Sequence, residues 1–155
     1  MYDIDSWTGY YMELKFFENR TEDQLVSEVH VTHAAVVVEM DGKVLYVKKR
    51  GKSTLELPSI DVSGNEFPAM AVRRLLTEQL NAEESSLRFV SAYSVTDGEE
   101  TRYGALYYAD ITSMRTLNDP GLCGSYFLSL PPEDREKWSS PETDIPLLEK
   151  ATGKK

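Results

Sequence analysis

Cysteine is nearly absent from this 155-residue sequence, since Cys123 is its only one. A single cysteine cannot close an internal disulfide, which agrees with a reducing compartment, and no activating residues surround it that would favour a nucleophile. Long apolar runs are also lacking. No stretch reaches the roughly 18 consecutive apolar residues of a membrane-spanning helix, and the opening MYDIDSWTGYY does not resemble an export signal. We therefore expect a cytoplasmic protein without a membrane partner.

Positive charge is scarce as well, with 17 Lys and Arg against 26 Asp and Glu and a formal net charge of −9. Proteins gain much of their affinity for nucleic acids by neutralising phosphates with Lys and Arg, so we expect no nucleic-acid partner. The local exception is YVKKRGK, which contains Lys48, Lys49, Arg50 and Lys52. This cluster is either a solvated strand end or an edge that contacts phosphate, and only its surroundings decide between the two.

Linkers and internal repeats are missing too, and a chain of this length with 41% hydrophobic residues suits one globular domain. We divide it into an N-terminal extension, residues 1–28, and a main domain, residues 29–155. Within the extension, YYMELKFF at 10–17 predicts an extra strand, with a short helix as the alternative. Its aromatic residues suggest an edge strand or a dimer interface, so a homodimer is a further hypothesis.

Two β-hairpins are expected around Asp-Gly dipeptides, which favour tight turns because Gly tolerates positive φ. The apolar, β-branched segments 29–40 and 43–50 flank Asp41-Gly42, and the segments 87–95 and 101–111 flank Asp97-Gly98. The continuous apolar run at 34–38 predicts a strand buried on both faces. With a helix between the hairpins and a short one at 145–150, this order predicts an α/β fold of the α+β type, with helices packed on a mixed sheet.

The helix between the hairpins is expected at 67–80, with Pro68 in its first turn, where a missing N–H costs little. Its apolar residues recur at helical spacing and predict the stripe that faces the core: Ala69, Val72, Leu76 and Leu80. Leu75 lies on a second face beside Arg74 and Glu78. This second face requires either further chain that covers it or a cleft that it lines.

The loop and helix carry a spaced pattern of residues. Leu57-Pro58 precedes Gly64-Asn65-Glu66, and Ala71, Arg74, Leu76 and Glu78 follow on the helix. This pattern resembles the signature of the Nudix hydrolases, in which Gly and Glu lead to Arg-Glu, an apolar residue and a Glu-Glu pair. The ending KWSSPETDIPLLEK is similar to that of some members, so the resemblance runs from about residue 30 onward. It implies a Nudix-like mixed β-sheet sandwiched between helices.

The sequence departs from this signature at five positions. Ser59 and Ile60 stand where the family has Gly-Gly, Leu75 where it has the Glu after Arg, Gln79 where it has the second Glu of the pair, and Asn81 where it has the closing Gly. Leu offers no metal ligand. Gln offers a neutral carbonyl that cannot act as a base. The signature is therefore degenerate.

The resemblance implies hydrolysis of a nucleoside diphosphate linked to another moiety, with Mg²⁺ or Mn²⁺ held by carboxylates. It implies Glu78, Arg74 and Glu66 as catalytic residues, and Glu78, Glu66 and Gln79 as the metal ligands. Arg50 and Lys48 would bind the substrate's phosphates. Because Leu75 and Gln79 replace two of the three metal-ligand glutamates, the activity of this divergent hydrolase is weak or lost. The alternative is a non-catalytic Nudix-fold module that binds a nucleotide-like ligand or a protein partner.

Several of these residues have a second interpretation. Glu66 either complements the dipole of the helix that follows or takes part in the metal site. The resemblance implies that Arg74 braces the catalytic Glu and the loop, and an ion pair with Glu78 one turn along is the alternative; we favour a structural role.

Three loop acids offer replacement carboxylates, although solvated turn acids are the simpler interpretation: Asp61, Glu99 and Glu100. We reject a metal site at His30 and His33, because positions three apart on a strand point to opposite faces.

Overall fold

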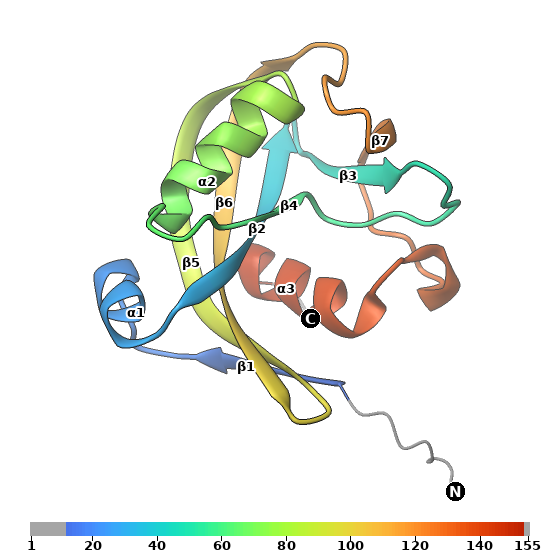
Figure 1. Ribbon diagram of the computed structural model, residues 1–155. Helices are drawn as coiled ribbons and strands as arrows, with labels where there is room; N and C mark the ends of the chain where they lie inside the picture. Colours follow the sequence, from blue (N-terminus) through green and yellow to red (C-terminus); the bar gives the residue numbers. More distant parts are fainter. Residues whose placement is uncertain (1–11, 154–155) are drawn as a thin grey trace, which may run out of the picture.

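The computed structural model describes residues 12–153 and shows one mixed β-sheet with helices on both of its faces (Figure 1). The strands are β1 (Met12–Phe17), β2 (Val31–Met40), β3 (Lys43–Lys49), β4 (Ser59–Asp61), β5 (Ala82–Asp97), β6 (Glu100–Met114) and β7 (Leu122–Leu128). The helices are α1 (Glu22–Glu28), α2 (Pro68–Arg74) and α3 (Pro141–Thr152). The strand order is β1-β5-β6-β2-β3-β7, with β4 paired to β2.

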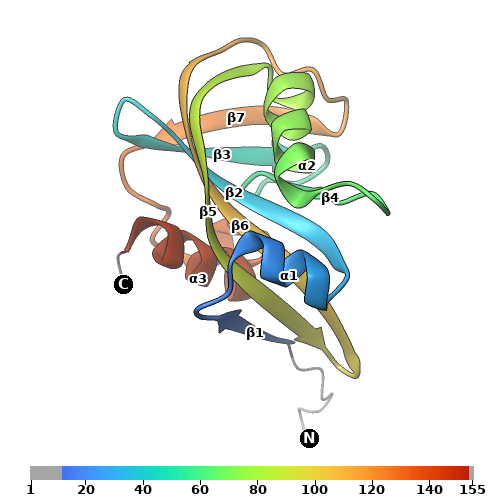
Figure 2. The same cartoon turned by 90° about the vertical axis from the view of Figure 1, so that its left-hand side faces the viewer.

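The sheet separates two hydrophobic layers. α1 and α2 cover one face, and α3 covers the other (Figure 2). β2 and β6 run parallel, whereas the other strand pairs are antiparallel. The predicted α+β sandwich around a mixed sheet is confirmed.

β2 lies at the centre of this sandwich, and its run of small and β-branched residues is buried on both sides. Ala34, Val36 and Val38 pack toward α2, while Ala35 and Val37 pack toward α3, and each side chain is at most 2% exposed. β2 therefore confirms the predicted doubly buried strand. Both predicted hairpins also form, with φ of 54° at Asp41 and 79° at Gly42 in the first turn and 66° at Gly98 in the second.

The N-terminal part of the described chain adds a strand and a helix to the sheet. β1 pairs with β5 over all six of its residues, so the strand interpretation of 12–17 is confirmed. Positions 10 and 11 of the predicted strand lie outside the described residues. α1 was not predicted. Its capping box, in which Thr21 and Gln24 bond each other's backbone N–H groups, was nevertheless visible in the sequence.

Two helices differ from their predicted bounds. α3 begins at Pro141 and ends at Thr152, so it is longer than the expected 145–150. The expected helix at 67–80 exists, but its α-helical part ends at Arg74 and the next residues, Leu75–Gln79, form a π-helical turn. No helix among residues 12–153 is long and apolar enough to cross a membrane.

Candidate functional site

The signature loop and helix are joined by an ion pair between Arg74 and Glu66. The Nε and Nη2 atoms of Arg74 lie 3.1 Å and 2.9 Å from the two carboxylate oxygens of Glu66, and the backbone N–H of Ser63 also donates to Glu66. The hydrogen bonds from Arg74 lower the pKa of Glu66. Arg74 forms its ion pair with Glu66 of the loop and not with Glu78. The hydrogen bonds to Glu66 raise the pKa of Arg74, and the charge of Glu78 adds to this effect. The structural role expected for Arg74 is compatible with this pair.

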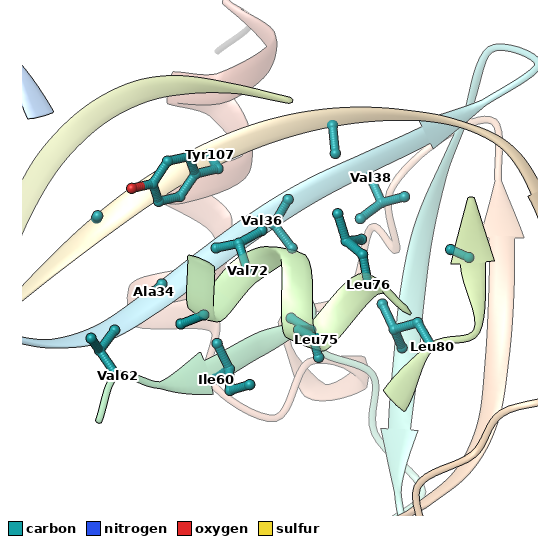
Figure 3. Packing of buried hydrophobic residues seen from close by; sticks show 14 of the residues in the cluster. Ala34, Val36, Val38, Ile60, Val62, Val72, Leu75, Leu76, Leu80 and Tyr107 are labelled. Carbon is teal, nitrogen blue, oxygen red and sulfur yellow. The ribbon is translucent and has the colours of Figure 1, made fainter. Parts of the chain in front are cut away.

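Leu75 belongs to the hydrophobic core and does not line a polar cleft. It is 2% exposed and lies in the same buried cluster as Ile60 of β4 (Figure 3). The second face of the helix, on which Leu75 lies, is therefore covered by further chain and lines no cleft, because β4 packs along α2. Two departures from the signature, Ile60 for Gly and Leu75 for Glu, thus fill the same part of the core with apolar side chains.

Glu78 and Gln79 lie on the π-helical turn, where their backbone is tied to the loop that joins β6 to β7. The side-chain amide of Asn118 donates to the carbonyl of Glu78 at 3.3 Å, and its backbone N–H donates to that of Gln79 at 2.9 Å. Asn81 ends the helix with φ of 57°, a left-handed conformation that Asn adopts more easily than most residues. The replacement of the closing Gly by Asn is therefore compatible with the backbone.

The donors around this turn do not fit a magnesium cluster. Leu75 has no donor and points into the core, and the carboxylate of Glu66 is held by Arg74. Glu78 is exposed, and Gln79 beside it is neutral. Mg²⁺ and Mn²⁺ prefer several hard oxygen ligands, usually with carboxylate charge. Among residues 12–153, no group of three or more His, Cys, Asp and Glu side chains is arranged to hold a metal ion.

Two of the three loop acids lie far from this turn. Glu99 and Glu100 lie at the tip of the β5–β6 hairpin, at the end of the sheet opposite the π-helical turn (Figures 1 and 2). The side chain of Asp61 is 99% exposed and lies 3.7 Å from Nδ1 of His33. His30 and His33 line different cavities, which agrees with the rejection of a histidine metal site.

The basic strand end is engaged in local contacts. Arg50 donates from Nε to the carbonyl of Pro120 at 2.8 Å, and Nζ of Lys49 lies 3.2 Å from a carboxylate oxygen of Glu56. Lys48 places its ammonium 5.2 Å from the centre of the Tyr126 ring. These contacts favour the interpretation as a strand end and turn, and phosphate binding by Arg50 and Lys48 stays a prediction.

A cavity of about 490 Å³ opens on the other face of the sheet, between the strands and the beginning of α3. This volume lies within the usual range for small-molecule sites. Apolar walls come from Ala35, Val95 and Leu147. Its lining includes polar side chains from four strands and α3, among them His33, Asp61, Tyr93, Arg102, Thr143 and Asp144.

Asp144 is the most perturbed carboxyl group of this cavity. Burial raises its pKa to about 7, and nearby Glu56 adds to this effect. The backbone N–H of Leu57, which donates to Oδ2 at 3.1 Å, and the charge of Lys49 oppose it. Burial also lowers the pKa of His33, although Asp61 acts in the other direction. Perturbed pKa values in a cavity are typical of functional sites.

The sequence analysis missed this cavity. Asp144 lay just before the helix expected at 145–150, and Tyr93 was one aromatic residue of the strand expected at 87–95, so neither was singled out. Only the packing of α3 against the sheet brings them together, and no local pattern in the sequence indicates that packing.

The comparisons with solved structures identify the architecture. The chain aligns with the pyrophosphohydrolase BsRppH of Bacillus subtilis over 93% of its own length and 91% of that chain, with 22% identity and a TM-score of 0.72. The chain has the Nudix fold. A NUDIX hydrolase of Nitrosomonas europaea aligns over 79% of this chain and 88% of its own, with 21% identity and a TM-score of 0.64.

A third Nudix structure contains a ligand. The NUDIX domain of Shewanella oneidensis NrtR, solved in complex with ADP ribose, aligns over 86% of this chain and 98% of its own, with 15% identity and a TM-score of 0.63. No protein-family model matches the sequence, and a search of curated protein sequences found no match. The likeness therefore lies in the fold, as the residues at 57–78 led us to expect.

Proposed function

We propose that this chain is a non-catalytic Nudix-fold module that binds a nucleotide-like small molecule in the cavity between the sheet and α3. The observation that carries this proposal is the burial of Leu75 with Ile60 in the core, where the Nudix resemblance places a metal-binding Glu and a loop Gly. Leu75 and Ile60 thus serve packing, and neither side chain offers a metal ligand.

Electrostatics supports the loss of hydrolysis. Cleavage of a diphosphate linkage needs divalent metal to neutralise the charge that develops on the phosphoryl oxygens and to activate water. Glu78 is the only carboxylate between residues 67 and 80, and one carboxylate beside a neutral Gln79 holds such an ion weakly. The hydrolase interpretation would require further acids, and among residues 12–153 no group of three or more His, Cys, Asp and Glu side chains is arranged to hold a metal ion.

Ligand binding is supported by the cavity and by the fold comparison. The cavity combines apolar walls with a few convergent polar groups, which is the usual composition of a small-molecule site. The NrtR Nudix domain was solved with ADP ribose, so a nucleotide derivative is the ligand class that the fold suggests. The division at residue 28 and the homodimer remain part of the proposal, and β1 at the sheet edge is the segment that a second copy would approach.

Calorimetric titration with Mg²⁺ and Mn²⁺ tests this proposal, together with phosphate release from nucleoside triphosphates, nucleoside diphosphate sugars and ADP-ribose. We expect no metal binding and no turnover in the millimolar range, and ADP-ribose binding that EDTA does not change. Glu78→Gln should behave like the wild type. Metal binding and turnover that both disappear in Glu78→Gln, but persist in the exposed control Glu133→Gln, would show a working hydrolase.

A further inference from the structure

The hydroxyl group of Tyr93 is buried in the cavity without a hydrogen-bond partner. Tyr93 is 2% exposed, and its hydroxyl oxygen has no partner among the described residues. Burial also raises the pKa of this phenol, which keeps the hydroxyl protonated and able to donate. A buried hydroxyl without a partner costs free energy, and such groups in a cavity indicate a binding partner that the protein itself does not supply.

Gly104 allows this hydroxyl group to reach the middle of the sheet. Tyr93 on β5 pairs with Gly104 on β6, which in turn pairs with His33 on β2. A Cβ atom on Gly104 would lie 2.3 Å from Cζ and 2.6 Å from the hydroxyl oxygen of Tyr93, so the ring lies across the glycine. Any other residue at this position would push the phenol away. The absence of a side chain at Gly104 thus leaves the space in which the Tyr93 hydroxyl lies over β6.

Asp144 faces the same part of the cavity from α3. The N–H of Leu57 anchors its carboxylate, and the charge of Asp144 is close enough to contribute to the raised pKa of Tyr93. No hydrogen bond joins the two side chains in the described structure. Both line the same cavity, so both polar groups are available to a ligand in it. One group donates through O–H, and the other accepts when it is ionised.

We infer that Tyr93 and Asp144 form a specificity-determining pair for a planar heterocycle, whose edge presents an acceptor to the hydroxyl and a donor to the carboxylate. This donor–acceptor pattern is that of a lactam or amidine, as on the pairing edges of nucleobases. The apolar walls made by Ala35, Val95 and Leu147 suit the faces of such a ring. The inference rests on the proposed function and adds the chemistry of the ligand's buried end.

A phosphate group fits this end of the cavity poorly. An ionised Asp144 repels an anion, and Asp61 lines the same cavity. Arg102 is the lining residue with a permanent positive charge, and its exposed side chain comes from β6 two positions before Gly104. The anionic part of the ligand therefore belongs on the Arg102 side, with the uncharged ring toward Tyr93.

Calorimetry with base-modified nucleotides tests the pair. The probes are UMP and AMP, each compared with a methylated form that lacks the donor, 3-methyl-UMP and N6,N6-dimethyl-AMP, at pH 8 and without metal. We expect UMP or AMP to bind, and its methylated form to bind at least about tenfold more weakly. Tyr93→Phe should weaken binding of the unmodified nucleotide about tenfold, whereas Tyr46→Phe should leave it unchanged.

Tyr46→Phe is a matched control because Tyr46 is a buried tyrosine on the same face of the sheet that does not line the cavity. Tyr93→Phe removes an oxygen without a protein partner, so folding should survive, and thermal unfolding verifies this. Nucleotide binding that is equal for methylated and unmethylated probes, or equal in Tyr93→Phe, overturns the inference and leaves the proposed function standing. Absence of binding by every nucleotide contradicts the proposed function itself.

Discussion

Replacing Asp144 with Asn should stabilise the protein at pH 8 and lose that effect at pH 4. The carboxyl group has a pKa of about 7 in the folded protein, against 3.8 as its ordinary value. Between these values the folded state retains a proton that the unfolded state has released. The free energy of unfolding therefore falls as the pH rises from about 4 to about 7, and this contribution is constant above the higher value.

The size of the effect follows from this gap. At about 1.36 kcal/mol per pKa unit, the charged carboxylate costs the fold on the order of 4 kcal/mol at pH 8, which is an upper limit because the cavity admits water. The groups that act on Asp144 are Glu56 and Lys49 from the sheet side and Thr143 on its own helix, together with the N–H of Leu57. Tyr93 faces it across the cavity with a neutral hydroxyl.

Urea unfolding of wild type and Asp144→Asn between pH 4 and pH 8 measures this cost. Asn keeps the side-chain volume and can still accept the N–H of Leu57 through its amide oxygen, so only the titrating charge is removed. The control is Asp61→Asn, which changes an exposed acid at the same cavity. Equal pH slopes for wild type and Asp144→Asn would refute the reasoning, as would a variant that is less stable at every pH.

Substitutions at Leu75, Gly104 and Asn81, with their controls, test the packing around the signature helix and the cavity. Leu75→Glu restores the acid of the Nudix signature inside the core, and it should lower the free energy of unfolding in urea by about 3–5 kcal/mol. Thr77→Glu, on the exposed side of the helix, should change it little. Equal stabilities of the two variants would contradict the core position of Leu75. Gly104→Ala should cost about 1–3 kcal/mol, and Tyr93→Ala in the same chain should remove most of that penalty; additive costs would argue against the contact. Asn81→Gly should be tolerated, while Asn81→Ala should cost about 1 kcal/mol by thermal unfolding, and the reverse order would contradict the left-handed backbone.

Local sequence signals predicted much of the fold. The Asp-Gly dipeptides predicted the turns of both hairpins, because such tight turns need residues that tolerate positive φ. The run at 34–38 indicated a central strand because apolar and polar residues do not alternate in it. α1 was missed because a helix of seven residues has too short an apolar pattern to stand out, although its capping box was present.

The candidate site depended on long-range contacts that the sequence did not reveal. An ion pair of Arg74 with Glu78, four residues along the helix, was one of the two roles considered. In the structure the guanidinium of Arg74 donates two hydrogen bonds to Glu66, a loop residue eight positions earlier. The apolar contact of Leu75 required β4 to lie along α2. The cavity required Tyr93, Gly104 and Asp144 to come from three elements, and none of them belongs to the Nudix signature.

The central claim is that this Nudix fold binds its ligand without metal and leaves it intact. The most direct measurement is calorimetric titration with nucleoside diphosphate sugars in EDTA and in excess Mg²⁺, followed by ³¹P NMR of the recovered ligand. We predict the same dissociation constant in both solutions and an unchanged phosphorus spectrum. Binding that requires Mg²⁺, with the appearance of monophosphate signals, would contradict the account and show that Glu78 retains a catalytic site.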